Sequence, residues 1–437
     1  MIARTKTRRT TAIALALAAG ISLVATACAG SGGPEEVESS GLGDIPTDTT
    51  GTVRILMENV PDTDIVQQIA GSFNEVYPDI TVEIETLTFD QMRDKLISSF
   101  QAPEPAYDLI VVDNPWMVDF VEAGFLEPLD DRIESTTGFE ADDFFSPLTD
   151  ITTVDGATYG VPFYNYALGY LYREDLYEAA GLAVPSTLDE LVSNVQALTT
   201  DGRTGIAMQP QRGYKIFEEW ANWLFAAGGS IYDEDGNPSL DTPEAEAALE
   251  AYITAYNTAA PANSLSWAFD EALRSVSGGE SASMISYNWN LPALNDPDGV
   301  SGDLAGEFKL APMPGGKQVL GSWSWAIPHN SDASDAAWAF ISWITSPEVD
   351  VERVVAGGAA IRESSLEDPA LLSDGYGADY YDAIIEILSD AEPLTNGANG
   401  EEMIQAVGTA LNEAVAGTTS VEDALADAQA EAEQIQG

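Results

Sequence analysis

The sequence predicts an α/β protein with more than one hydrophobic core. Apolar residues alternate between strand spacing and helix spacing along most of the chain, which is typical of strands that helices join into a parallel sheet. The chain has 437 residues, a length that suggests two or three domains. Hydrophobic residues make up 45% of the chain and charged residues 20%, so it can bury sizeable cores. We therefore expect a globular protein built from two α/β sets.

The N-terminal segment has the layout of an export signal. Basic residues at positions 4–9 precede an apolar, uncharged run over 10–27, and small residues lead into Cys28, the only cysteine of the chain. This ending resembles the lipobox that bacterial lipoprotein signal peptidase cuts. We expect a lipoprotein signal peptide over 1–27 and a lipid anchor at Cys28. The alternatives are an ordinary signal peptide with a chance cysteine, or an uncleaved anchor.

Residues 28–51 are rich in Gly, Ser, Pro and acidic side chains and have no periodic apolar positions. This composition is typical of a flexible tether, and we expect it to connect the lipid-anchored Cys28 to the folded body.

The first α/β set follows the tether. Apolar spacing predicts strands at 53–57 and 80–84 and a continuous, fully buried strand at 108–113, with helices at 65–77 and 92–100 between them. Asn114 and Pro115 then have the pattern of a helix cap followed by a first helical residue, and Gly124 ends that helix.

The second set is richer in helices. The spacing Thr187-x-x-Glu190 is that of a capping box, and Gly181 follows a short helix as a stop signal. The predicted strands are 167–172, 281–287 and 321–328, and the predicted helices are 174–180, one that opens at Thr187, 218–227, 244–257, 269–276, 334–345 and a helical end over 401–436.

Composition excludes several function classes. Lys and Arg total 17 against 72 Asp and Glu, and the resulting formal net charge of -55 repels nucleic-acid backbones. One Cys and one His cannot form an internal disulfide, a Cys/His zinc cluster or a His-rich catalytic network. We therefore expect no nucleic-acid partner, no metal and no cofactor.

Short strings along the body, in order, resemble the extracellular solute-binding proteins (family 1) of bacterial ABC transporters, in the branch that binds sugars and sugar alcohols. The strings are FNEVYPDITV (73–82), YDLIVVD (107–113), AGFLEPLD (123–130), GVP (160–162), YLYREDL (170–176), AGL (180–182), PSTLDEL (185–191), SASM (281–284), APMP (311–314), AAWAFI (336–341) and SVEDAL (420–425). The resemblance covers residues 52–435.

This resemblance implies a two-lobed periplasmic-binding-protein fold of type II, with a ligand cleft between the lobes. On that pattern the chain crosses between lobes near 162–166, 311–314 and 351–356. The N-terminal lobe would then comprise 52–162 with 315–352, and the C-terminal lobe 163–310 with 355–437. It further implies a monomeric, extracytoplasmic receptor, held to the outer face of the cell membrane by its lipid, that delivers a carbohydrate to permease subunits.

A sugar site needs aromatic platforms and planar polar side chains, and the sequence supplies both at element ends. Tyr287, Asn288 and Trp289 follow a predicted strand, where an aromatic side chain of the family commonly stacks on the sugar. Core packing of Trp289 is the alternative. Trp323 and Trp325 lie two apart on a strand and so point to one face, either into the cleft or against the helix at 334–345.

Other candidates lie at strand ends and crossings. Asp113 and Trp116 lie at the carboxyl end of a buried strand, at the sheet edge where open α/β sheets bind ligands. Asn114 lies beside them, but it could instead cap the helix that follows. Further ligand-binding candidates are Glu58 after the first strand, Tyr164 and Asn165 at the first crossing, and Arg212 on a loop. Arg362 is also a candidate, because it matches a family segment whose arginine often reaches the cleft. The alternative for Arg362 is a surface ion pair.

Two other functions are weighed against carbohydrate capture. A secreted glycosidase would need two carboxylates, but among 72 acids such a pair arises by chance, and no nucleophile elbow or phosphate-binding glycine loop is present, so we expect no enzyme. The second alternative keeps the fold and binds a cationic compatible solute through aromatic rings. Tyr380 and Tyr381 resemble the paired tyrosines of ferric-binding relatives, although helix packing is the simpler interpretation.

Overall fold

The computed structural model describes residues 43–436, apart from residues 103, 375–377 and 396. The expected signal peptide 1–27, the lipidation site Cys28 and most of the expected tether therefore lie outside the described residues. Across the described part of the chain, no helix combines the length and the apolar character that crossing a membrane requires.

The first lobe is built on three parallel strands, as the alternating pattern predicts. Strand β1 pairs in parallel with β2 on one side and with β3 on the other. All five residues of β3 are buried, which explains its continuous apolar run. The elements of this lobe are β1 (Gly51–Glu58), α1 (Pro61–Val76), β2 (Ile80–Leu87), α2 (Phe89–Phe100), β3 (Leu109–Asp113), α3 (Asn114–Glu122), α4 (Asp130–Ser135), η1 (Ala141–Asp143), α5 (Ser146–Asp150), β4 (Thr153–Val154), β5 (Ala157–Thr158), α12 (Ser334–Ile344) and α13 (Pro347–Val355).

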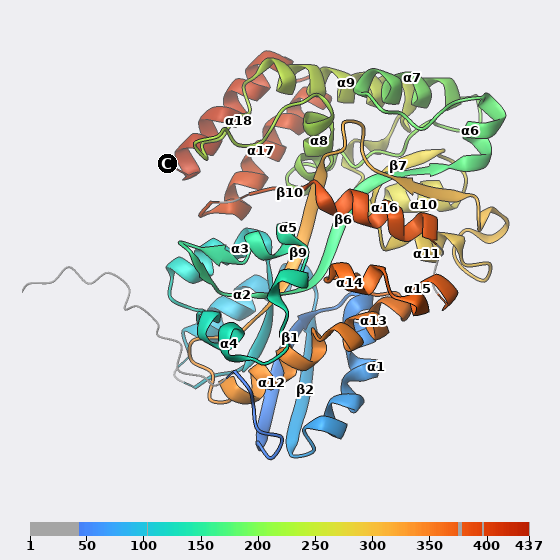
Figure 1. Ribbon diagram of the computed structural model, residues 1–437. Coiled ribbons are helices and arrows are strands. Elements are labelled where there is room, and N and C mark those ends of the chain that lie inside the picture. The colour runs from blue at the N-terminus through green and yellow to red at the C-terminus, as the bar shows by residue number, and fades with distance from the viewer. Residues whose placement is uncertain (1–42, 103, 375–377, 396, 437) are drawn as a thin grey trace, which may run out of the picture. The chain divides into compact units, whose positions relative to one another are not determined.

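The second lobe consists mainly of helices, which Figure 1 shows in green, yellow and red. Helix α17 packs against α18 and α8, and α9 packs against α7 and α8. The elements are α6 (Glu174–Ala180), α7 (Leu188–Leu198), α8 (Tyr214–Ala226), α9 (Pro243–Ala259), η2 (Ser264–Ser266), α10 (Phe269–Ser277), β7 (Ser283–Tyr287), α11 (Asn290–Asn295), η3 (Gly302–Leu304), β8 (Phe308–Ala311), α16 (Ala378–Ser389), β10 (Ala391–Pro393), α17 (Gly400–Val415) and α18 (Val421–Gln436). Two short helices, α14 (Glu363–Leu366) and α15 (Pro369–Asp374), pack against α13 of the first lobe.

Two long antiparallel strands connect the lobes. Strand β6 (Val161–Arg173) pairs with β9 (Gln318–Ala326), and Figure 1 shows the two strands running together between the lobes. The strand order is β2-β1-β3-β9-β6-β7, with β10 beside β9 and β8 beside β6. The sheet is therefore mixed, whereas alternation alone predicted a parallel one. Strand β9 enters the first lobe from the second, so it runs antiparallel to β3.

Buried side chains form two clusters. The first contains the core of the first lobe and extends into the second lobe, where it includes buried side chains of α10, β7, α11, β8 and α16. The second cluster lies in the second lobe, among α7, α8, α9, α17 and α18. The exact domain boundaries remain predictions.

Local signals at helix ends have mixed outcomes. Gly181 follows α6 in the left-handed conformation, with φ of 66°, as a stop signal should. The Thr187 side chain accepts a hydrogen bond from the Glu190 backbone N–H, while the Glu190 carboxylate turns to Ser186. Asn114 does not cap α3. Asp113 occupies the cap position and Asn114 is the first helical residue, because the helix starts directly where β3 ends.

The last residues of the expected tether are part of the folded body. The Asp44 carboxylate accepts hydrogen bonds from the Thr137 backbone N–H (2.7 Å) and hydroxyl (2.8 Å). The Gly43 carbonyl accepts one from the Trp338 indole, and the Ile45 side chain is buried. Residues 43–51 therefore pack against the first lobe, which corrects the expected tether at its C-terminal end. Composition gave no sign of this because the contacts are made by isolated residues.

Candidate functional site

A cavity of about 530 Å³ lies between the lobes and is the candidate ligand site. This volume is typical of pockets that hold small molecules. Both lobes and the connecting strand β9 contribute to its walls. The lining residues are Glu58, Val60, Phe89, Asp113, Gln211, Arg212, Tyr214, Lys215, Glu218, Tyr287, Trp289, Gly321, Trp323, Glu401 and Gln405.

The first lobe contributes residues at the carboxyl ends of its parallel strands. Glu58 ends β1, Asp113 ends β3, and Phe89 begins the helix after β2. Strand register then places Trp323 of β9 between Asp113 on one neighbouring strand and Tyr164 on the other. Side chains that are far apart in sequence thus meet at one sheet edge, where open α/β sheets bind ligands.

The second lobe contributes the first turns of α8 and α17. Helix α8 begins at Tyr214, and its first turns bring Tyr214, Lys215 and Glu218 to the cavity. Helix α17 passes so close to the loop before α8 that a Cβ at Gly408 would clash with the Gly213 carbonyl. This close approach brings Glu401 and Gln405 to the same wall.

Two hydrogen-bonded groups fix charged side chains in the cavity. The Lys215 ammonium donates to Glu218 Oε2 (2.9 Å) and to the Tyr287 hydroxyl oxygen (2.8 Å), and the Tyr287 hydroxyl donates to Glu218 Oε1 (2.7 Å). The Tyr164 hydroxyl donates to Glu58 Oε2 (2.9 Å) across the sheet. These bonds hold the groups in place before any ligand arrives.

Burial shifts the proton equilibria of several lining groups. Burial raises the pKa of Glu58 to about 7, and the Tyr164 hydrogen bond and the Lys215 charge oppose that shift. Burial, together with the charges of Glu58 and Glu401, raises the pKa of Asp113 well above its usual range. Burial also raises the pKa of Tyr287, so its phenol is neutral at physiological pH.

Six of the side chains predicted to bind ligand line this cavity, and two others support it from behind. Trp116 is buried with its ring centroid 5.3 Å from that of Trp323. Tyr164 contacts two lining residues, Glu58 through its hydroxyl and Trp323 through its ring, with centroids 5.7 Å apart. The six lining side chains are Glu58, Asp113, Arg212, Tyr287, Trp289 and Trp323.

Three other candidates lie in buried surroundings outside the cavity wall. Trp325 is fully buried against Phe163, with ring centroids 4.3 Å apart, because it lies one residue pair deeper in the first lobe than Trp323. The Asn165 side chain donates to the Ala360 carbonyl. Asn288 is buried, and its backbone N–H donates to the Ala167 carbonyl (3.1 Å).

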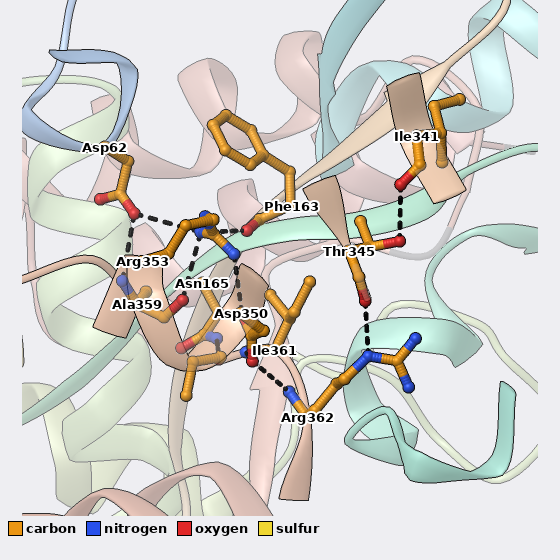
Figure 2. Close-up of polar contacts among 11 residues, drawn as sticks. Asp62, Phe163, Asn165, Ile341, Thr345, Asp350, Arg353, Ala359, Ile361 and Arg362 are labelled. Atoms are coloured by element: carbon orange, nitrogen blue, oxygen red, sulfur yellow. Dashed lines mark hydrogen bonds and ion pairs between the residues drawn. The ribbon is translucent and has the colours of Figure 1, made fainter. Parts of the chain in front are cut away.

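Arg362 is also placed differently from the expectation. Its Nε donates to the Thr345 carbonyl (2.6 Å) and its Nη1 pairs with Asp143 (3.2 Å). The guanidinium carbon lies 4.0 Å from the centroid of the Phe144 ring, so Arg362 holds loops of the first lobe together and does not reach the cavity. Figure 2 shows Arg362 beside Arg353, with its side chain turned toward Thr345.

Sequence reasoning missed other lining residues, among them Phe89, Lys215, Glu218, Glu401 and Gln405. A signal existed for the α8 pair, because Ile216, Trp220 and Leu224 continue the helical spacing back to position 214. Glu401 and Gln405 gave no such signal, since helix packing alone decides which face of α17 meets the cavity.

The combined lining can bind a small hydroxylated molecule. Five aromatic side chains offer flat faces, while carboxylates and amides accept or donate hydrogen bonds at their rims. Over the described residues, no group of three or more His, Cys, Asp and Glu side chains has an arrangement that could hold a metal ion.

Comparisons with known proteins agree with this geometry. A probable amino-acid ABC transporter periplasmic-binding protein of Sinorhizobium fredii is 25% identical over 298 residues, covering 67% of this chain and 68% of that protein. The mannitol-binding protein of Pseudomonas aeruginosa is 26% identical over 316 residues, covering 69% and 71%.

A solved structure and a family model complete the comparison. An ABC transporter solute-binding protein of Agrobacterium radiobacter, in complex with ribitol, is 26% identical with a TM-score of 0.77, and the match covers 89% of this chain and 99% of that one. Its likeness confirms the expected two-lobed α/β fold. Residues 56–351 match the family model described as bacterial extracellular solute-binding protein. The chain therefore belongs to the bacterial extracellular solute-binding protein family.

Proposed function

We propose that this protein captures a sugar or sugar alcohol outside the cytoplasm and delivers it to the permease of an ABC importer. The observation that carries the proposal is the inter-lobe cavity of about 530 Å³, which combines stacking rings with hydrogen-bonding rims. The relatives support the same ligand class, because one is a mannitol-binding protein and a solved neighbour contains ribitol.

Capture would proceed by closure of the lobes around the ligand. Glu58, Phe89 and Asp113 contact it from the first lobe, while Tyr287 and Trp289 contact it from the second. A ligand that touches both walls binds the closed arrangement better than an open one, and this difference in affinity drives closure. The permease would then recognise the closed form.

We propose that Cys28 is lipidated on its thiol and becomes the first residue when residues 1–27 are removed, so that a monomeric receptor remains at the outer face of the cell membrane. Globomycin treatment of producing cells should block the removal of residues 1–27. Accumulation of an uncleaved precursor that carries labelled fatty acid is the expected result. A Cys28→Ala variant that still incorporates fatty acid would contradict the anchor.

We also propose that capture is the whole activity, without turnover of the ligand. Purified protein incubated with oligosaccharides should release no reducing ends over many hours. Release that persists after repeated purification and disappears in an Asp113→Asn variant would instead indicate a glycosidase.

The direct test is the melting temperature of the purified protein against sugars, sugar alcohols, oligosaccharides and betaines. A ligand at 100 times its Kd stabilises the native state by about 2.7 kcal/mol, which should raise the melting temperature by a few degrees. A shift from at least one carbohydrate is expected. If a broad carbohydrate panel produces no shift while the folded protein is intact by circular dichroism, the proposed ligand class is wrong.

A further inference from the structure

The cavity has more negative than positive side chains, and its cations already have partners. Glu58, Asp113, Glu218 and Glu401 line it together with Arg212 and Lys215. Lys215 is bonded to Glu218, and Arg212 pairs with Glu413 at 3.1 Å on the exposed side. Among the described residues, no ion pair includes Glu58, Asp113 or Glu401.

Two of these unpaired carboxylates are also short of hydrogen-bond donors. Asp113 is only 4% exposed, and within the described part of the chain no side chain donates to its carboxylate, which accepts a hydrogen bond from the Asn114 backbone N–H. Glu401 Oε2 is buried, and the described residues provide no partner for it, whereas its Oε1 accepts a bond from Gln405 (3.0 Å). Buried polar atoms without partners are rare in native proteins and indicate that another molecule supplies the missing donor.

The three carboxylates also act on one another. Besides burial, the negative charges of Glu58 and Glu401 both raise the pKa of Asp113, so both repel a negative charge on the Asp113 carboxylate. A hydroxyl group can donate one hydrogen bond there but brings no positive charge. An ammonium group brings three donors and a charge, so it offsets both the missing bonds and the repulsion.

We infer that the captured carbohydrate carries a basic amino group, as an amino sugar or amino polyol does, and that its ammonium binds at Asp113 between Glu58 and Glu401. This inference rests on the proposed function, which supplies the carbohydrate part of the ligand. The sugar face stacks on Trp289 or Trp323. The ring faces around the cavity attract the same cation through their π-systems.

Calorimetric titration of the purified full-length chain, with its lipid site mutated by Cys28→Ser, tests this inference. The probes are D-glucosamine, D-galactosamine and 1-amino-1-deoxy-D-sorbitol, each compared with its neutral parent and, for the two sugars, with the N-acetylated form. At neutral pH we expect at least one amine to bind roughly tenfold or more tightly than its parent, as a charge-assisted hydrogen bond allows. Acetylation should remove the advantage.

Variants locate the effect. Asp113→Asn should reduce the preference for the amine over its neutral parent at least tenfold. Glu401→Gln, at a half-buried position in the first turn of α17, is a second variant in case Asp113→Asn fails to fold. Asp427→Asn on the exposed face of α18 makes the same charge change far from the cavity and should leave the preference unchanged.

The outcomes separate this inference from the proposed function. Equal affinity for amine and parent, or an unchanged preference in both Asp113→Asn and Glu401→Gln, overturns the amino group and leaves carbohydrate capture standing. Binding of a quaternary betaine with no response to any carbohydrate overturns both. Selective binding of an amine that both variants weaken supports both.

Discussion

At the residue scale, the candidate site depends on a few side chains whose roles differ. Trp289 is half-buried at the exit of β7 and stacks against Tyr287, with centroids 6.1 Å apart and rings 12° from parallel. Trp323, by contrast, is 4% exposed and packs among other rings. Trp289 can therefore be removed at smaller cost to the fold, which makes it the better probe of ligand stacking.

Trp289→Ala is expected to weaken ligand binding by about 2 kcal/mol, roughly 30-fold in Kd, because the stacking surface is lost. Calorimetric titration with the carbohydrate that gives the largest melting shift measures this change. Trp343→Ala is the matched control, since Trp343 is also half-buried but packs against Phe73 and Phe340, far along the first lobe. An unchanged Kd in Trp289→Ala would remove Trp289 from the site.

Tyr164 controls the protonation of Glu58. Its hydroxyl donates to the Glu58 carboxylate, which lowers a pKa that burial has raised to about 7. Tyr164→Phe should therefore move the midpoint of the pH dependence of Kd upward. Tyr170→Phe, at a buried tyrosine that bonds Ser283 in the second lobe, should leave that midpoint in place. A midpoint identical in all three proteins would contradict the assigned role of Glu58.

At the element scale, Arg353 connects helix α13 to two other segments, α1 and β6. Its guanidinium pairs with Asp350 (2.8 Å) on its own helix and with Asp62 (3.5 Å) on α1, and it donates to the Phe163 carbonyl (2.8 Å) on β6. Figure 2 shows these contacts meeting at one side chain. Helix α13 is thereby fixed to one of the two strands that connect the lobes.

Arg353→Met is expected to lower the free energy of unfolding by about 3–5 kcal/mol, because it leaves Asp62 and Asp350 buried without a counter-charge. Urea unfolding followed by circular dichroism measures the loss. Lys309→Met removes an exposed cation 3.8 Å from Glu174 and should cost less than about 1 kcal/mol. Similar losses in the two variants would show that the buried network contributes little.

At the scale of the whole molecule, buried acidic side chains make the free energy of unfolding depend on pH. Burial raises the pKa of Glu58 to about 7 and that of Glu219 to about 8. Above their ordinary pKa the unfolded chain releases these protons while the folded protein keeps them. Stability is therefore fully present at low pH and is lost as pH rises through the folded values.

The free energy of unfolding should fall as pH rises above the ordinary glutamate pKa of 4.5, by on the order of 1 kcal/mol for each pH unit and each group, up to about pH 7 for Glu58 and about pH 8 for Glu219. Urea titrations across this range measure the slope. Glu219→Gln should flatten it at every salt concentration, whereas general repulsion among the 72 acids would be screened by salt. A slope that vanishes in high salt and persists in Glu219→Gln would contradict the role of the buried acid.

Most local elements could be predicted because the sequence encodes them locally. The fully buried β3, the stop at Gly181 and the cap at Thr187 each follow from residues within a few positions. The candidate site was only partly predictable. Glu58 and Asp113 lie at strand ends, which apolar spacing reveals. Trp325 and Arg362 also have side chains of types that bind sugars, but both are buried away from the cavity.

The sequence by itself determined the α/β class, the family and the strand ends that hold two of the site's carboxylates, since apolar spacing, motif order and turn residues act over short distances. Only the tertiary structure decided that β9 runs antiparallel into the first lobe, that Lys215 and Glu401 line the same cavity as Asp113, and that residues 43–51 pack onto the body. These features depend on contacts between residues far apart in the chain, and no local pattern records which faces meet.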